Sequence, residues 1–394
     1  MAGQAGAGPV GLSSPPLGLR LVTWLFLLSW LVLAAFPLVW IAAMSFKVPF
    51  DAFSKNPLDV LLGPQTRSSR GGISALDLLA YAAALGVLLR LLTQPTPPRL
   101  GKPGTVALFL VLLLVVLPLA LPPIDRALAP VPGAGLLGRP LLGITWEHYR
   151  AVWVGSAFYR QFGNSLMVTA GVVTVSLTAG TLAAYALART RTNLAFWLLI
   201  AALVFRALPH SVLVAGYMPV FIDSRRILAP LWDWPATGWF FHLFADAPPT
   251  LYGRILPVIL VLVAINQPFT IWMLRSFFAS IPAELDEAAR VDGCTYLGAF
   301  RRVIMPVMWP GVITAGLFSF LLAYNDFLVT SLLLDQQART MVPAISQFLN
   351  SENDTTDQIR AIAAAVSITA PLFLLVIAFQ RQIVSGLTAG AVKG

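Results

Sequence analysis

The sequence predicts an all-α protein, a bundle of helices that crosses a membrane several times. Three observations support this class. Apolar residues make up 58% of the chain and charged residues only 11%, whereas an average soluble domain has about 25% charged residues. Several apolar runs approach or exceed the roughly 20 residues that a helix needs to cross the hydrocarbon core. No ten-residue segments alternate in hydropathy, as the strands of a transmembrane barrel would.

The apolar runs predict eight spans. With approximate ends, they are Leu21–Met44, Ile73–Leu92, Thr105–Leu121, Asn164–Leu187, Leu194–Ile222, Leu251–Phe278, Ile304–Leu334 and Ala361–Phe379. The first run is longer than the core of a cleaved signal peptide, about 7–15 residues. We therefore expect it to be retained as a span, with a cleaved signal as the alternative. The third run is the shortest and contains Pro118.

A proline-rich, basic segment, residues 93–104, separates the second and third spans. It is typical of a tight turn, so these two spans are expected to form a hairpin with its tip on the cytoplasmic side. Eight spans with the N-terminus inside place residues 280–302 and the C-terminus inside as well. Lys and Arg residues divide almost evenly between the two sides, so the positive-inside rule adds little support.

Composition also excludes several classes of function. The net charge of +9 comes from dispersed basic residues, which argues against nucleic-acid binding. A single cysteine, Cys294, excludes an internal disulfide and a cysteine metal cluster. No G-x-x-x-x-G-K-[ST] loop is present. If ATP drives this protein, another chain must bind it.

Residues 280–302 form a polar segment between two apolar ones. Pro282 is suited to the first turn of a helix, and the acidic residues that follow favour its N-terminal end. Ala288 and Ala289 are small enough for close approach of a partner. Gly293 can adopt the left-handed conformation that ends a helix. A second short helix, Thr295–Arg302, is expected before Pro306 and Pro310 start the next span.

This segment resembles the EAA motif of ABC importer permeases. The string from Glu287 to Gly293 is EAARVDG, and Val303-Ile-Met-Pro306 follows after nine residues. The family has Ile and Leu where this chain has Val303 and Met305. Tyr324–Phe327 resembles a polar pair of the following span, and residues 379–394 resemble the ending of MalG-type sugar permeases. The resemblance covers about residues 143–394 and the first span.

The resemblance implies a type I ABC importer permease fold, with six core spans and an extra two-span hairpin. It implies three regions: an arm and first span (1–47), an insertion (48–142) and a core permease domain (143–394). Within the core, residues 282–302 would be the coupling helix that docks in a groove of a cytoplasmic ATPase. The implied ATPase contacts are Glu284, Glu287, Ala288, Ala289, Asp292, Gly293 and Pro306, with Gly386, Gly390, Lys393 and Gly394 of the tail against the ATPase dimer.

The implied function is that of a transmembrane permease subunit in an ATP-driven, binding-protein-dependent importer of a di- or oligosaccharide, such as maltose or another glucoside. It would be a transport subunit and not an enzyme. Its partners would be a second homologous permease, two ATPase subunits, an external sugar-binding protein and the lipid of a bacterial inner membrane. This chain would bind no cofactor, because ATP and magnesium would be held by the ATPase subunits.

Polar residues inside the predicted spans are candidates for the translocation pathway, because ionisable groups in a membrane usually face a bundle interior or a water-filled cavity. Arg206 and His210 are four residues apart and would share one helical face, although a structural pair is an equal alternative. Tyr217 could stack on a sugar but would more often be packing. Asn325 and Asp326 interrupt the seventh span, where a gate role is favoured.

Two other classes of function stay open. A carrier or channel subunit not linked to an ATPase would often contain inverted repeats with broken helices, and no clear repeat is present. A membrane-embedded enzyme would need clustered catalytic groups in its spans, and few polar residues occur there.

Overall fold

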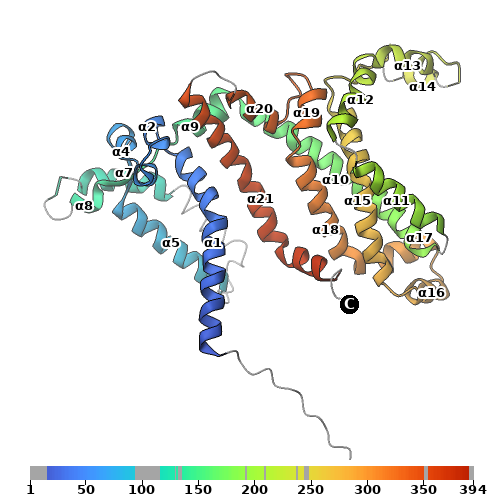
Figure 1. Cartoon of the computed structure of the whole chain (residues 1–394), viewed down its shortest axis with the longest axis horizontal. Coiled ribbons are helices and arrows are strands. Elements are labelled where there is room, and N and C mark those ends of the chain that lie inside the picture. Colours follow the sequence, from blue (N-terminus) through green and yellow to red (C-terminus); the bar gives the residue numbers. More distant parts are fainter. Residues whose placement is uncertain are drawn as a thin grey trace, which may run out of the picture. The chain divides into compact units, whose positions relative to one another are not determined.

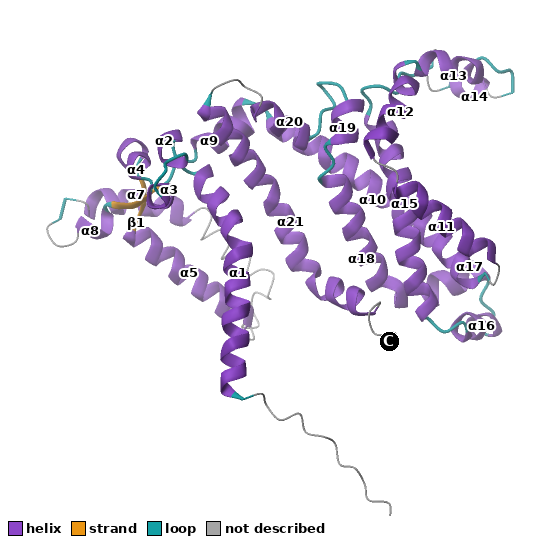
Figure 2. Ribbon diagram, viewed as in Figure 1, coloured by secondary structure: helices purple, strands orange, loops and turns teal. Residues whose placement is uncertain are grey.

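The computed structural model describes residues 16–93, 116–128, 130–131, 135–190, 193–207, 210–236, 238–243, 248–349 and 354–389. The chain forms two compact units, residues 1–148 and 149–394, and each is described by itself. Both are built almost entirely from helices (Figures 1 and 2). The predicted all-α class is confirmed, apart from one pair of very short strands.

The first unit begins with one long apolar helix, followed by short helices and a two-stranded sheet. Its elements are α1 (Leu17–Ser45), α2 (Pro49–Ala52), α3 (Pro57–Leu62), α4 (Pro64–Arg70), β1 (Gly72–Ser74), α5 (Ala75–Thr93), α7 (Leu117–Leu128), α8 (Gly135–Gly138) and β2 (Pro140–Gly143). The helix α9 (Glu147–Arg150) lies at the boundary between the units. Prolines occupy the first turns of α2, α3 and α4, where a missing N–H has no cost.

The two ends of the predicted insertion meet. The backbone N–H of Thr145 donates to the carbonyl oxygen of Phe46 at 2.8 Å. The imidazole Nε2 of His148 lies 3.0 Å from the carbonyl oxygen of Lys47, and the buried ammonium of Lys47 donates to the carbonyl oxygen of Gly143. Burial lowers the pKa of Lys47, while Asp51 opposes the shift. The chain therefore leaves and returns at one place, and the boundaries 48 and 142 of an insertion stay a prediction.

The antiparallel strands β1 and β2 close this region further. Gly72 pairs with Gly143, Ile73 with Leu142 and Ser74 with Pro140. The sequence analysis predicted no strands, because segments of three and four residues are too short to show an alternating hydropathy pattern. Of the hairpin predicted within the insertion, the second span falls on α5, whose apolar part, Ala75–Val87, is shorter than the spanning helices of the described part. Residues 94–115, which include the tip and most of the third span, lie outside the described residues.

The second unit holds the core permease region of the sequence analysis. Its elements are η2 (Ala151–Gly155), α10 (Phe158–Arg189), α11 (Asn193–Ala207), α12 (His210–Ile222), α13 (Ser224–Trp232), α14 (Gly238–His242), α15 (Ile255–Ser280), α16 (Glu284–Val291), α17 (Tyr296–Ala299), η3 (Phe300–Ile304), α18 (Met305–Tyr324), α19 (Leu328–Leu333), α20 (Met341–Leu349) and α21 (Thr355–Ala389). Both η elements are π-helical turns.

Five helices of the described part are long and apolar enough to cross a membrane. They are Leu17–Ser45, Phe158–Arg189, Ile255–Ser280, Tyr296–Tyr324 and Thr355–Gln380. They correspond to the first, fourth, sixth, seventh and eighth predicted spans. The protein is therefore multi-pass, as the apolar runs predict.

One predicted span ends earlier in the structure, and another is described in two parts. The fifth, Leu194–Ile222, is described as α11 and α12, and residues 208 and 209, which separate them in the sequence, lie outside the described residues. The seventh was expected to continue to Leu334, but α18 ends at Tyr324 and a separate short helix, α19, follows.

The core of the second unit is formed by α10, α15 and α18, which pack against one another. One apolar cluster at their lower end in Figure 1 contains Leu274, Phe278, Ile304 and Met308. Gly180 of α10 lets the helices approach closely, because a Cβ there would lie 2.8 Å from Thr270 of α15. Small residues at such contacts are typical of packing between membrane helices, where burial from water supplies no driving force.

The meeting ends of the insertion generate a prediction. Replacing residues 49–141 with a short glycine–serine linker should leave the second unit inserted in its original orientation, because residues 46 and 145 are already hydrogen-bonded neighbours. A reporter fused after Gly394 would measure the orientation. The matched control removes only residues 94–143, which keeps α5 but takes all of β2, the pairing partner of β1. That variant should misinsert, and correct insertion of the control with misinsertion of the full deletion would contradict the insertion boundaries.

Candidate functional site

The predicted coupling segment is present as a compact helix–turn–helix at one end of the second unit (Figure 1). The first helix, α16, ends in a turn in which Gly293 has a φ of 87°, the left-handed conformation expected from the sequence. The N–H of Cys294 donates to the carbonyl oxygen of Ala289 at 3.0 Å. The hydroxyl of Thr295 then accepts from the N–H of Gly298 at 3.1 Å and caps α17.

The second helix of this segment differs from the expectation. A separate helix over Thr295–Arg302 was predicted, but α17, the π-helical turn η3 and α18 form one helical run from Tyr296 to Tyr324. The π-helical turn lies directly before Pro306, whose nitrogen cannot donate a hydrogen bond. Because the run is continuous, a displacement of α17 passes directly into the membrane span α18.

The structure divides the predicted contact residues by exposure. Glu284, Glu287, Ala288, Asp292 and Gly293 are exposed, as is Pro306 in the first turn of α18. Ala289 is 6% exposed and faces inward. Of the two alanines expected to meet a partner, the structure therefore presents Ala288 and uses Ala289 for internal packing.

Large apolar side chains extend this exposed surface. Val291, Tyr296 and Leu297 are 87%, 73% and 69% exposed. All three lie before α18, outside the packed bundle. The guanidinium of Arg290 lies 5.0 Å from the centre of the Tyr296 ring, and its Nη1 donates to the Tyr296 hydroxyl at 3.1 Å. We define the docking surface as Glu284, Glu287, Ala288, Val291, Asp292, Gly293, Tyr296 and Leu297. Exposed apolar patches of this kind mark interaction sites.

A buried carboxylate fixes α16 to the membrane helices. Asp286 is 8% exposed, and its two oxygens have different partners on α10. Oδ2 accepts from Nε of Arg189 at 2.7 Å, and Oδ1 accepts from the hydroxyl of Tyr185 at 2.5 Å. Charge-assisted bonds of this length are stronger than neutral ones. We call Tyr185, Arg189 and Asp286 the anchor.

The anchor also reaches the end of α15. The Nη1 atom of Arg189 donates to the carbonyl oxygens of Phe278 and Ile281, at 3.4 and 3.2 Å. These carbonyls lie at the helix C-terminus, where a cation is favourable. The Tyr185 ring packs against Phe278 and Phe300, with ring centres 5.5 and 4.8 Å apart. One arginine thus joins α10, α15 and α16 at a single point.

The sequence analysis did not identify the anchor. Asp286 was considered only as one of several acidic residues favouring the start of a helix. Basic residues, Arg189 among them, were considered only by the side of the membrane on which they would lie. Their separation of 97 positions gives no local pattern. The available signal was an acidic residue on the inward face of a short helix, in phase with the buried Ala289 three positions later.

The pathway candidates do not form one group. Arg206 lies in α11 and His210 begins α12; residues 208 and 209 and both side chains lie outside the described part, so the shared helical face stays a prediction. Tyr217 packs against an apolar core cluster of the second unit, in keeping with the packing alternative.

Asn325 and Asp326 lie at the break between α18 and α19. The Asn325 amide donates to the carbonyl oxygen of Leu321 at 3.1 Å, and the Asp326 carboxylate accepts from the N–H of Thr330 at 2.9 Å. The polar pair therefore explains why the seventh span ends ten residues earlier than predicted, at Tyr324 instead of Leu334. A gate role for this pair stays a prediction.

A second polar group, missed from the sequence, lies between the core helices. Asn266 is 1% exposed and donates to the hydroxyls of Ser319 at 2.7 Å and Thr270 at 3.1 Å. The Ser319 hydroxyl in turn donates to the carbonyl oxygen of Ala315 at 3.0 Å. These bonds connect α15 to α18 inside the bundle, as polar residues do between membrane helices. We interpret the group as a connection between helices because its members are buried.

Of the predicted tail contacts, only Gly386 lies in the described part, within the helix α21. Gly390, Lys393 and Gly394 lie outside the described residues. Within the described part of the chain, no group of three or more His, Cys, Asp or Glu residues is placed to hold a metal ion.

Comparison with known proteins identifies the family to which the chain belongs. Residues 176–388 match the family described as "Binding-protein-dependent transport system inner membrane component". The chain is similar to the trehalose transport system permease protein SugB of Mycobacterium tuberculosis, with 35% identity over 64% of this chain and 83% of that protein. It is also similar to the diacetylchitobiose uptake system permease protein DasC of Streptomyces coelicolor, with 31% identity over 64% and 82%. The trehalose/maltose transport system permease protein MalG of Thermococcus litoralis is 30% identical over 66% and 85%.

The anchor generates a stability prediction. The Arg189 and Asp286 side chains are only 21% and 12% exposed. Arg189→Gln or Asp286→Asn should each reduce the free energy of local opening of α16 by about 1.5–3 kcal/mol, the range for hydrogen bonds to charged groups. Hydrogen exchange of the α16 amides measures this quantity.

The matched control is Arg302→Gln, an exposed arginine of the same segment, which should leave exchange in α16 unchanged. The double variant Arg189→Gln/Asp286→Asn should lose less than the sum of the two single changes, because the two residues share one interaction. Additive losses, or unchanged exchange in both single variants, would show that the anchor does not hold α16.

Proposed function

Because this chain belongs to the family of inner membrane components of binding-protein-dependent transport systems, we propose that it is one permease subunit of an ATP-driven importer for a di- or oligosaccharide. The observation that carries the proposal is the exposed docking surface held on a buried anchor, within the region that matches the family. The names of the three relatives, which refer to trehalose, diacetylchitobiose and trehalose/maltose, support a glucoside such as maltose as cargo.

The docking surface supports an ATPase partner on the cytoplasmic side. Its acidic and small residues lie on exposed positions of α16, while Tyr296 and Leu297 add apolar area at the start of α17. A protein groove that is apolar in its centre and basic at its rim would complement this surface. ATP and magnesium would be held by two such ATPase subunits. A second, homologous permease and an external sugar-binding protein would complete the importer.

The anchor suggests how motion would enter the membrane. A partner that displaces α16 also displaces the ends of α10 and α15, because Arg189 bonds to Asp286 and to the carbonyls of Phe278 and Ile281. The same displacement reaches α18 through the continuous helical run from α17. The three core helices would then rock together as a rigid group, a common form of alternation between two states.

The length of α10 is sufficient to place its two ends on opposite sides of the membrane. At about 1.5 Å per residue, its 32 residues span about 48 Å, more than the roughly 30 Å hydrocarbon core. The docking surface at its end would face the cytoplasm, with both chain termini on that side. The opposite end of the unit, with α20, would face outward, where residues 335–360 could meet the sugar-binding protein.

Charge reversal on the docking surface tests the proposal. Glu287→Lys should reduce sugar uptake by about tenfold or more without loss of membrane insertion, because it opposes a complementary partner surface. Uptake of labelled sugar and co-purification of the ATPase are the measurements. The matched control is Asp233→Lys, an exposed acidic residue of the segment after α13. Normal uptake with Glu287→Lys would contradict a coupling role.

Affinity purification distinguishes the proposal from a carrier or channel without an ATPase, and from a membrane enzyme. A tagged chain in its native membrane should bring a P-loop ATPase and a second permease with it. Sugar transport by this chain alone, without nucleotide, would instead support the carrier.

A further inference from the structure

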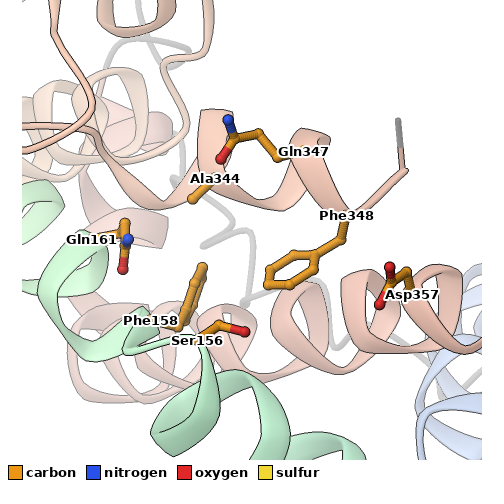
Figure 3. A pocket seen from close by; sticks show the side chains of 7 residues that line it. All are labelled: Ser156, Phe158, Gln161, Ala344, Gln347, Phe348 and Asp357. Atoms are coloured by element: carbon orange, nitrogen blue, oxygen red, sulfur yellow. The ribbon is translucent and has the colours of Figure 1, made fainter. Parts of the chain in front are cut away.

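A pocket of about 330 Å³ lies at the end of the second unit opposite the docking surface. It is formed where the start of α10 meets α20 and the first turn of α21. Its lining consists of Ser156, Phe158, Gln161, Ala344, Gln347, Phe348 and Asp357 (Figure 3). Its volume is near the lower limit for small-molecule sites and would suit one sugar ring better than a long chain.

The pocket and the anchor occupy the two ends of one helix. Phe158 is the first residue of α10 and Arg189 the last. Because α10 is longer than the membrane is thick, the pocket lies across the membrane from the docking surface. In the orientation proposed above, it opens on the side to which a binding protein delivers its cargo.

The floor of the pocket is rigid and aromatic. Phe158 is 1% exposed and belongs to an apolar cluster with Val152, Met341 and Ala344, against which Phe348 packs. The rings of Phe158 and Phe348 both point towards the middle of the pocket, with Ser156 between them (Figure 3). Flat apolar ring faces suit the C–H face of a pyranose, and a packed floor costs little ordering on binding.

The polar groups around this floor are mainly hydrogen-bond acceptors. The Asp357 carboxylate is held by Arg360, whose Nη1 donates to Oδ1 at 2.7 Å. Its Oδ2 accepts no hydrogen bond from the residues that the structure describes. The Gln161 amide nitrogen, in the orientation that satisfies its neighbours, donates to the carbonyl oxygens of Ala157 and Phe158 at 2.9 and 3.3 Å. This orientation uses the amide nitrogen of Gln161 and leaves its amide oxygen as an acceptor.

We propose that this pocket binds one ring of the transported sugar on the external side, before the sugar enters the membrane. Sugar hydroxyls would donate to Asp357 and Gln161, while the half-buried Phe348 covers the ring face and the buried Phe158 supports it from below. A phosphate or other anion is disfavoured because the one charged side chain in the lining is a carboxylate. The inference rests on the proposed function, since it assumes that the cargo is a sugar.

Binding to the purified complex tests the proposal directly. The complex in lipid nanodiscs, without nucleotide or binding protein, is mixed with maltose, trehalose or diacetylchitobiose, and saturation-transfer NMR detects contact. We expect a signal from at least one sugar. Phe348→Leu, which keeps an apolar side chain but removes the flat ring, and Asp357→Asn should each weaken binding by about tenfold. Leu349→Ala, an exposed neighbour of Phe348 outside the lining, is the matched control and should bind like the wild type.

Uptake measurements separate failure of this inference from failure of the proposed function. If the wild type imports sugar but none of the three sugars contacts the complex, or the variants bind normally, the pocket proposal is overturned and the importer assignment stands. If the variants weaken only association with the sugar-free binding protein, the pocket is a protein contact and the proposal is also overturned. If the wild-type complex imports no sugar, both fail.

Discussion

The position of α16 depends on one charged contact between residues 97 positions apart in the chain. Asp286 on the inward face of α16 meets Arg189 at the end of α10, and Arg189 also bonds to carbonyls at the end of α15. The helix α16 has only eight residues, and isolated helices of this length are not stable in water. The contact therefore supplies stability that α16 lacks by itself. The exposed surface of α16 therefore has a defined orientation only because its opposite face is held.

The same contact determines what a partner can move. A surface loop that gives way when pushed would not transmit displacement to the membrane. Here α10 packs closely on α15 at Gly180, and the buried Asn266 connects α15 to α18. Packed helices move as a unit because their interfaces do not deform continuously. The anchor at one end and the pocket at the other are both built on α10, so this helix offers a direct physical connection between the two sides of the membrane.

The segment predicted to be an insertion, residues 48–142, is closed by contacts of its own. It begins and ends at hydrogen-bonded neighbours near Phe46 and Thr145, and the strands β1 and β2 pair its inner segments. An excursion closed in this way adds its own contacts without changing the path of the chain around it. Long insertions at surface positions have a modest entropic cost, which fits a large addition to a transport subunit of otherwise ordinary topology.

The sequence by itself determined the class, most of the spans and the position of the docking segment, but not which of its residues are exposed. Apolar runs report the length needed to cross a membrane, and the left-handed turn at Gly293 follows from the freedom of glycine. The sequence analysis noted that Asn325 and Asp326 interrupt the seventh span but did not predict that the helix ends there, although the contacts that end it, to Leu321 and Thr330, are local. Local pattern could not reveal the anchor or the pocket. Asp286 is distant in the chain from Tyr185 and Arg189 of α10, as Asp357 is from Phe158, and only the tertiary packing of α10 brings each set together.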